Sequence, residues 1–303
     1  MTVPMIIDTD PGVDDAVALM LAAASPEVRL LAVTTVFGNA DVEVTTANAV
    51  RLRTLAGLGD LPVAAGADRP LVYPQLRRTD RWHGRDGLGG HADLLPQPSG
   101  PISALGAVTL MATLLRGAAT PVTLVAIGPL TNIALLLAVH PELKPRIGRI
   151  VIMGGNLAGS SAEFNIDSDP EAARRVLVEE DVPTTLVPLN VTQRATVDDA
   201  WLAELAEAGP RCAALAGIIG HCGQQRASPV ALHDSLAVLE AAVAGMLATT
   251  PMILQVGCDH GGDRGAVRPG SGQETTARVV QVACDADPTS INAMILHRLR
   301  SLR

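Results

Sequence analysis

The sequence predicts an α/β protein with a mostly parallel central sheet flanked by helices, in the manner of a Rossmann-like open sheet. Short β-branched apolar runs alternate with longer helical patterns, which is typical of right-handed βαβ units covered on both faces. Of the 303 residues, 48% are hydrophobic but only 2% are aromatic, so Ala, Val, Leu and Ile must build the core. Because no linker, repeat or low-complexity tract interrupts the chain, we expect a single domain over residues 1–303.

The first predicted elements are a strand over residues 3–7 and a helix over residues 13–24, joined by a Pro11-Gly12 turn. Four carboxylates surround this turn: Asp8, Asp10, Asp14 and Asp15. Helix capping and the helix dipole account for two of them but not for all four. Like charges this close raise one another's pKa unless a cation neutralises them, and hard divalent cations prefer carboxylate oxygens. The turn therefore favours a metal site where a strand ends, which is where open α/β sheets bind ligands.

The later elements follow from the same patterns of apolar residues. In chain order they are a strand over 28–36, a helix over 41–56 with Asn48 and Arg51 on its polar side, a strand over 61–65, a helix over 103–116, a strand over 122–127, a helix from Pro129 to residue 139, a strand over 149–153, a helix over 169–179 capped by Asp169, and a strand over 184–189. The last third adds helices over 197–208, 211–225, 235–247 and 288–302, with strands over 252–257 and 276–283. A further short strand within 259–273 would give a small antiparallel extension near the C-terminus.

Residues 68–101 have no regular pattern and include the glycine-rich run W-H-G-R-D-G-L-G-G-H at 82–91. An irregular segment of this length within a compact domain is usually functional or forms a lid.

Composition and charge exclude several classes of protein. The formal net charge is −8 without a basic stripe, so we expect no nucleic-acid partner. No apolar run is long and continuous enough for a membrane span, and the first residues lack the features of a signal peptide. The four cysteines fit no zinc spacing, so we expect reduced thiols in a cytoplasmic protein. Nucleophile-elbow, dinucleotide-binding and Walker motifs are absent from the sequence.

Polar residues recur just beyond the predicted strand ends: Asn39, Asn132, Asn156 and the pair His233-Asp234, which opens a late helix. Because parallel strands end at one edge of a sheet, we expect these residues to converge with the aspartate turn.

Taken together, the motifs resemble those of the nucleoside hydrolases of the inosine–uridine-preferring type. The similar stretches are D-T-D-P-G-V-D-D-A at 8–16, T-T-V-F-G-N at 34–39, H-G-R-D-G-L-G at 83–89, G-P-L-T-N-I-A at 128–134, M-G-G at 153–155, A-E-F-N-I at 162–166, D-P-E-A-A at 169–173 and L-H-D-S-L-A-V at 232–238. They cover nearly the whole chain in order.

The resemblance implies hydrolysis of the N-glycosidic bond of ribonucleosides, giving ribose and a free base, in purine or pyrimidine salvage. It implies a Ca²⁺ ion held by Asp10, Asp15, Asp234 and the backbone carbonyl of Ile127. Asp10 is then also the general base, and His233 assists departure of the base. The implied substrate-binding residues are Asp14, Asn39, His83, Met153, Glu163 and Asn165. A homodimer or homotetramer is the implied assembly.

The chemistry agrees with these residue types, because carboxylates stabilise an oxocarbenium-like transition state and a metal activates water. Two departures from the family pattern stand out. The segment 156–162 is short and lacks the Gly-Asn pair that contacts the 5′-hydroxyl, and residues 217–231 contain no aromatic residue to stack on a base. Base preference and the hold on the 5′ end therefore stay open.

Two other readings remain. Asp8-Thr9-Asp10 matches the start of a haloacid-dehalogenase-type phosphohydrolase, but the only lysine, Lys144, stands in a poor context before Pro145. A degenerate homologue that binds ribosides without turnover is the other alternative.

Overall fold

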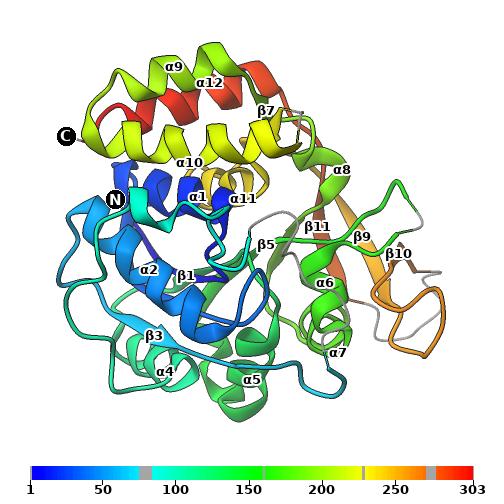
Figure 1. The fold of residues 1–303 in the computed structure, drawn as a ribbon. Helices are drawn as coiled ribbons and strands as arrows, with labels where there is room; N and C mark the ends of the chain where they lie inside the picture. Colours follow the sequence, from blue (N-terminus) through cyan, green and yellow to red (C-terminus); the bar gives the residue numbers. More distant parts are fainter. Residues whose placement is uncertain (1, 75–83, 160, 227–228, 271–277, 303) are drawn as a thin grey trace.

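A nine-stranded sheet runs through the protein in the order β10-β9-β11-β6-β5-β4-β1-β2-β3 (Figure 1). The computed structural model describes residues 2–74, 84–159, 161–226, 229–270 and 278–302. The strands are β1 (Val3–Thr9), β2 (Val28–Thr35), β3 (Val63–Ala65), β4 (Val122–Ala126), β5 (Ile147–Met153), β6 (Thr184–Val187), β9 (Ala248–Val256), β10 (Val267–Pro269) and β11 (Val279–Asp285). A separate two-stranded ribbon, β7 (Thr196–Val197) with β8 (Val230–Ala231), was not expected from the sequence.

The mostly parallel sheet and its antiparallel extension are both confirmed. Every pairing from β3 to β6 is parallel, and β11 pairs in parallel with β6. Strands β9 and β10 are antiparallel to their neighbours. The chain moves outward from β1 through β2 to β3 and then returns to the other side of β1 as β4. The topological switch point therefore lies between β1 and β4, and a crevice for ligands is expected at their carboxyl ends.

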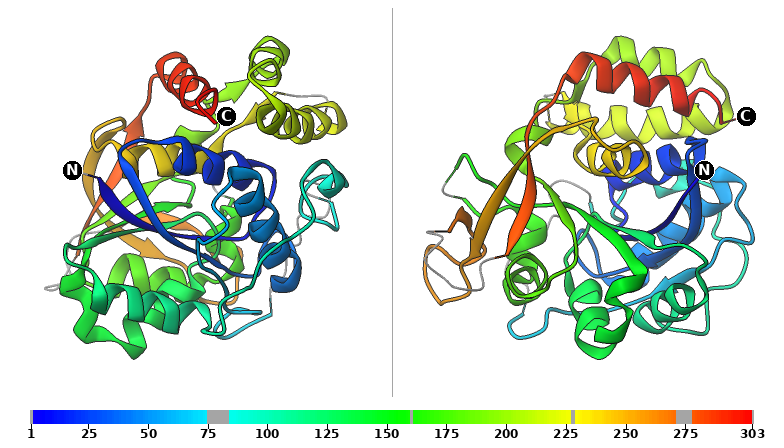
Figure 2. Two further views of the ribbon diagram at one scale, coloured as in Figure 1. Left: turned by 90° about the vertical axis from the view of Figure 1, so that its left-hand side faces the viewer. Right: turned by 180° about the vertical axis from the view of Figure 1, so that it is seen from behind.

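Helices cover both faces of the sheet (Figure 2). The helices are α1 (Val13–Ala24), α2 (Val42–Ala56), α4 (Ala107–Gly117), α5 (Thr131–Val139), α6 (Phe164–Ser168), α7 (Pro170–Arg174), α8 (Leu189–Thr192), α9 (Asp199–Ala206), α10 (Pro210–Arg226), α11 (His233–Ala242) and α12 (Pro288–Leu299). Short 3₁₀ segments are η1 (Ala92–Leu94) and η2 (Pro141–Arg146), and the π-helical turn η3 (Arg175–Glu179) continues α7. Helices α1 and α11 pack side by side, and α9, α10 and α12 form a further layer beyond them (Figure 1).

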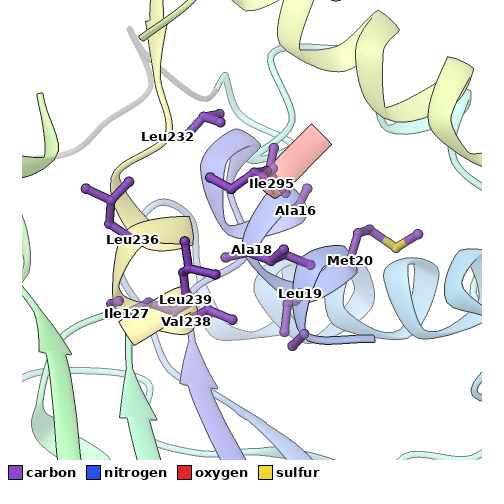
Figure 3. Packing of buried hydrophobic residues seen from close by; sticks show 14 of the residues in the cluster. Ala16, Ala18, Leu19, Met20, Ile127, Leu232, Leu236, Val238, Leu239 and Ile295 are labelled. Carbon is purple, nitrogen blue, oxygen red and sulfur yellow. The ribbon is translucent and has the colours of Figure 1, made fainter. Parts of the chain in front are cut away.

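Small aliphatic side chains fill the core, as the composition predicts. Residues alternate across β1: Met5 and Ile7 join the cluster beneath α1 and α11, whereas Ile6 joins the cluster beneath α4 and α5. Figure 3 shows Leu236, Val238 and Leu239 of α11 gathered with residues of α1, close to Ile127 at the end of β4. This tight contact places the start of α11 over the crevice.

Many element ends differ from the prediction by a few residues. Three of them have a clear local reason. The helix expected from residue 103 begins at Ala107, because Ser103 N–H instead donates to the carbonyl of Val63 beside the sheet edge. Strand β6 ends at Val187, since Pro188 caps α8. Helix α11 ends at Ala242 because the Glu240 carboxylate accepts the N–H groups of Gly245 and Leu247 and turns the chain.

The placement predicted for Asn48 on a polar helix side is wrong. Asn48 is only 2% exposed, since α2 turns it toward the aspartate turn and the 84–92 loop, while Arg51 is half-buried. Trp82 and His83 lie outside the described residues, so the lid expected in that segment stays a prediction. Within the part of the chain that the structure describes, no helix has the length and hydropathy of a membrane span.

Candidate active site

The switch point, where a ligand crevice is expected, is framed by the residues that follow β1 and β4. Asp10 follows β1, and Ile127 follows β4 with its N–H donating to the carbonyl of Asp8 at 2.9 Å. Asn39 follows β2, and Met153 ends β5. The sheet thus brings four of the predicted site residues to one edge, as parallel strands require.

Asp10 is fully buried, and its two carboxylate oxygens have different environments. Oδ2 accepts the backbone N–H of Asn39 at 2.7 Å. Among the residues that the structure describes, no donor reaches Oδ1. A Cβ at Gly128 would lie 2.7 Å from Oδ1, so glycine is needed for this close approach of the backbone. Burial, and secondarily the charge of Asp15, hold the pKa of Asp10 well above its usual range.

Three further carboxylates meet beside Asp10 at the start of two helices. Asp14 and Asp15 lie in the first turn of α1, and Asp234 lies in the first turn of α11. One oxygen from each of the three lies within 4.8 Å of the others. Asp15 is held in place by the Thr9 hydroxyl at 2.5 Å, the Gly12 N–H at 2.9 Å and the Asn39 amide at 3.2 Å. Asp234 is 3% exposed, and burial followed by the charge of Asp14 raises the pKa of its carboxyl.

This donor set fits a hard divalent cation. The carboxylates come from α1, α11 and the end of β1, and no basic side chain is among the hydrogen-bond partners found for them among the described residues. Buried anions without positive partners are costly, and the unused Oδ1 of Asp10 is a ready acceptor or ligand atom. The structure thus groups two of the predicted ligands, Asp15 and Asp234, with Asp14. Asp10 lies beside this group at the end of β1, near enough for the charge of Asp15 to raise its pKa, but it is not part of the group. The remaining predicted ligand, the carbonyl of Ile127, lies at the adjacent strand end and accepts the Asn165 amide at 3.2 Å.

Glu163 and Asn165 lie against the ends of β4 and β5. Glu163 caps α6, and its carboxylate accepts the N–H groups of Gly155, Asn165 and Ile166 at 2.9 to 3.2 Å. The Asn165 amide donates to the carbonyls of Ile127 and Met153. Burial raises the pKa of Glu163. These hydrogen bonds fix both side chains before any ligand is present.

His233 begins α11, one residue before Asp234, and its Nδ1 lies 2.8 Å from the Thr192 hydroxyl. His83, the other histidine predicted at the site, lies outside the described residues. Asn156 is engaged in its own loop, where its Oδ1 accepts the N–H groups of Ala158 and Gly159. It therefore lies on the crevice side of β5 but with its amide committed locally.

Asn132 supports the site from below instead of lining it. Its amide donates to Asp8 Oδ1 at 2.8 Å and to the Thr35 carbonyl at 2.9 Å, and its oxygen accepts the Ala67 N–H. Thr34 also donates to Asp8 Oδ1, at 2.5 Å. Burial raises the pKa of Asp8 to about 7, against the lowering effect of these two donors. Sequence reasoning missed the supporting threonines Thr9, Thr34 and Thr192, for which adjacency to a strand end was the only signal.

Comparison with known proteins gives one family. The family model described as inosine-uridine preferring nucleoside hydrolase matches residues 5–292. The chain is 50% identical over 204 residues to a pyrimidine-specific ribonucleoside hydrolase RihA from Shewanella baltica, an alignment covering 66% of this chain and 63% of that protein. It is 46% identical over 213 residues to the RihA of Salmonella paratyphi B, covering 69% of this chain and 67% of that protein.

Solved structures agree over the whole length. A plant nucleoside hydrolase, the PpNRh1 enzyme, superposes with a TM-score of 0.91 at 27% identity, covering 99% of each chain. An inosine-guanosine nucleoside hydrolase superposes with a TM-score of 0.87 at 28% identity, covering 99% of this chain and 98% of that chain. The purine-preferring ribonucleoside hydrolase of Gardnerella vaginalis gives a TM-score of 0.91 at 26% identity, with the same coverage.

Proposed function

This chain belongs to the inosine-uridine preferring nucleoside hydrolase family, and we propose that it hydrolyses the N-glycosidic bond of ribonucleosides to ribose and a free base. The observation that supports the proposal is the group of Asp14, Asp15 and Asp234 at the switch point, beside which buried Asp10 keeps one oxygen without a donor among the described residues. A phosphohydrolase of the haloacid-dehalogenase type finds no support in these comparisons.

In this proposal Asp10 accepts a proton from the attacking water at Oδ1, the oxygen that no protein group occupies among the described residues. Its other oxygen stays fixed on the Asn39 N–H, which holds the carboxylate in one orientation. The bond between the sugar and the base lengthens before water adds, so positive charge develops on the ribose ring. The surrounding carboxylates lower the free energy of that charged state because they are already in place.

The cation in this proposal is Ca²⁺, held by Asp10, Asp15, Asp234 and the Ile127 carbonyl. When bound, it supplies positive charge that lowers the pKa of the attacking water and favours the ionised carboxylates. Asp14, Asn39, Glu163 and Asn165 grip the ribose hydroxyls, and Met153 borders the sugar. The rigid hydrogen bonds of Glu163 and Asn165 support this role, since a prearranged wall loses little entropy on binding.

His233 is proposed to assist departure of the base. It stands next to Asp234 on α11, and the contact of its Nδ1 with the Thr192 hydroxyl holds the ring in place beside the carboxylates. His83 is proposed to lie near the base by family resemblance.

Pyrimidine ribonucleosides are the proposed preferred substrates. The support is the 46 to 50% identity, over 66 to 69% of this chain, to relatives named pyrimidine-specific. By resemblance we also propose that the protein is a homodimer or homotetramer. Analytical ultracentrifugation of the purified protein would give the number of subunits.

The test is a reducing-sugar assay with uridine, cytidine, inosine and adenosine, with and without a chelator. Ribose release that stops on chelation and returns with Ca²⁺ is the expected result. Riboside binding without ribose release would identify a degenerate homologue instead. Phosphate release from a phosphoester, with no ribose release, would identify the phosphohydrolase.

A further inference from the structure

Helix α2 contacts the aspartate turn of residues 8–15 through the side chain of Asn48. The Asn48 amide donates one hydrogen bond to the carbonyl of Pro11 at 3.1 Å and another to the carbonyl of Asp86 at 2.8 Å. Asn48 is 2% exposed, so neither bond competes with water. One side-chain nitrogen therefore joins the turn that carries Asp10 to the glycine-rich loop of residues 84–92.

The glycine-rich loop of residues 84–92 is held by its own hydrogen bonds and by core packing. The Asp86 carboxylate accepts three backbone N–H groups, those of Leu88, Gly90 and Ala92, at 2.8 to 3.0 Å. The Leu88 side chain is fully buried in the main core cluster. A loop fastened in both ways can serve as a fixed support.

Gly87 lets the loop come this close. A Cβ there would lie 2.9 Å from Asn48 Nδ2 and 3.1 Å from the Pro11 carbonyl oxygen. Its φ of +73° is also a conformation that favours glycine. Pro11 of the aspartate turn, Asn48 of α2 and Gly87 of the loop therefore meet at one contact.

We propose that Asn48 is a positioning residue for the active site. By holding the Pro11 carbonyl against the Asp86-capped loop, it sets where the aspartate turn presents Asp10 and Asp15 to the crevice. Asn48 touches neither the substrate nor the carboxylates themselves. The measurements of uridine hydrolysis and of Ca²⁺ affinity described below rest on the proposed function. The measurement of amide hydrogen exchange does not.

The test compares two variants that break the link with one that does not. Asn48→Leu removes the donor at similar volume, and Gly87→Ala inserts a methyl group into the same contact from the loop side. Arg51→Leu is the matched control, because Arg51 lies one turn further along α2 and bonds the carbonyls of Ala92 and Pro96 but not the turn. Circular dichroism and thermal melts establish that each variant folds.

Amide hydrogen exchange is the deciding measurement. Faster exchange in peptides covering residues 9–16 is expected for Asn48→Leu and Gly87→Ala, whereas Arg51→Leu should change only peptides near residues 92–97. Calorimetric titration should show Ca²⁺ affinity lowered by about 10- to 100-fold in the first two variants. For uridine hydrolysis, kcat should fall by about 10²-fold with KM little changed.

The proposal is overturned if exchange over residues 9–16 in Asn48→Leu matches the wild type, or if Arg51→Leu accelerates it equally. A wild-type protein that neither binds Ca²⁺ nor releases ribose would refute the proposed function, and the exchange data would still decide the role of Asn48.

Discussion

Asp10 carries an unusual combination of full burial, one committed oxygen and one oxygen without a donor among the described residues. Replacing it with Asn keeps the shape and the bond to the Asn39 N–H but removes the proton acceptor. We expect Asp10→Asn to lower kcat for uridine by about 10²- to 10⁴-fold. Because a buried charge disappears, its melting temperature in chelator should equal or exceed that of the wild type.

Glu43→Gln is the matched control, since it removes an exposed carboxylate on α2. It should change neither kcat for uridine nor the melting temperature. Wild-type turnover by Asp10→Asn would refute the role assigned to Asp10.

Recognition of the ribose hydroxyls gives a second prediction for single residues. If Asp14, Asn39 and Asn165 hold the 2′- and 3′-hydroxyls, a missing hydroxyl leaves buried polar groups unpaired. We expect kcat/KM for 2′-deoxyuridine to be lower than for uridine by about 10⁴-fold. Equal rates on the two nucleosides would remove the sugar contacts from the proposal.

For single residues, the sequence predicts a place in the site when the partner residues are close along the chain. The four aspartates of the turn could be predicted because they crowd within one strand-turn-helix unit. The support from Asn132 could not, since its bond to Asp8 joins residues 124 apart, and an Asn after a turn has the same sequence pattern in either role. The burial of Asn48 could not be predicted either, because a polar residue on the polar side of a helix has the same sequence pattern whether it is buried or exposed.

Among the elements, the short helix α6 depends on its cap. The Glu163 carboxylate accepts three backbone N–H groups and thereby places Asn165. We expect Glu163→Ala to lower the free energy of unfolding by about 1 to 2 kcal/mol and to lower activity as Asn165 loses its position.

Asp198→Ala is the control for α6, because Asp198 caps the surface helix α9 through the Trp201 N–H. It should lower stability by a similar amount while kcat/KM stays unchanged. Equal loss of activity in both variants would mean that α6 has no special link to the site.

The buried strands were predictable as elements, whereas their ends were not. Continuous apolar runs mark β1, β4 and β5 whatever their neighbours. The ends depend on local contacts that an apolar run does not reveal, as where Pro188 caps α8 and ends β6. The ribbon of β7 with β8 is two residues on each strand, too short to leave a period in the sequence.

For the whole molecule, the buried carboxylates predict how stability depends on pH and calcium. Burial raises the pKa of Asp8 to about 7 and raises the pKa values of Asp10 and Asp234. Without a cation, the folded protein therefore keeps protons that the unfolded chain, with ordinary pKa values near 4, has released. The free energy of unfolding in chelator should then fall as the pH rises from about 4 to 7.

Calcium should flatten this dependence, because it favours the ionised carboxylates. Thermal melts at several pH values, in high salt to screen surface ion pairs, measure both effects. A melting temperature in chelator that rises between pH 5 and 7 would contradict the prediction.

The class of fold was predictable at this scale because alternating strands and helices admit few topologies. The order of the strands was not predictable, since the sequence of an apolar strand does not show which strands it pairs with. The position of β4 beside β1, on which the crevice depends, is settled by packing between distant segments.

The strand order also has a consequence for biosynthesis. β1 leaves the ribosome early, yet β4 and α11 are needed to complete the crevice that begins at its end. At about 5 to 20 residues per second, the aspartate turn waits at least ten seconds or so for Asp234. During that interval the four carboxylates of the turn are not yet enclosed by β4 and α11, and water must solvate them. On the proposed function, the cation is therefore acquired late. A lanthanide whose emission depends on all of the proposed ligands would report the moment at which the last third of the chain docks.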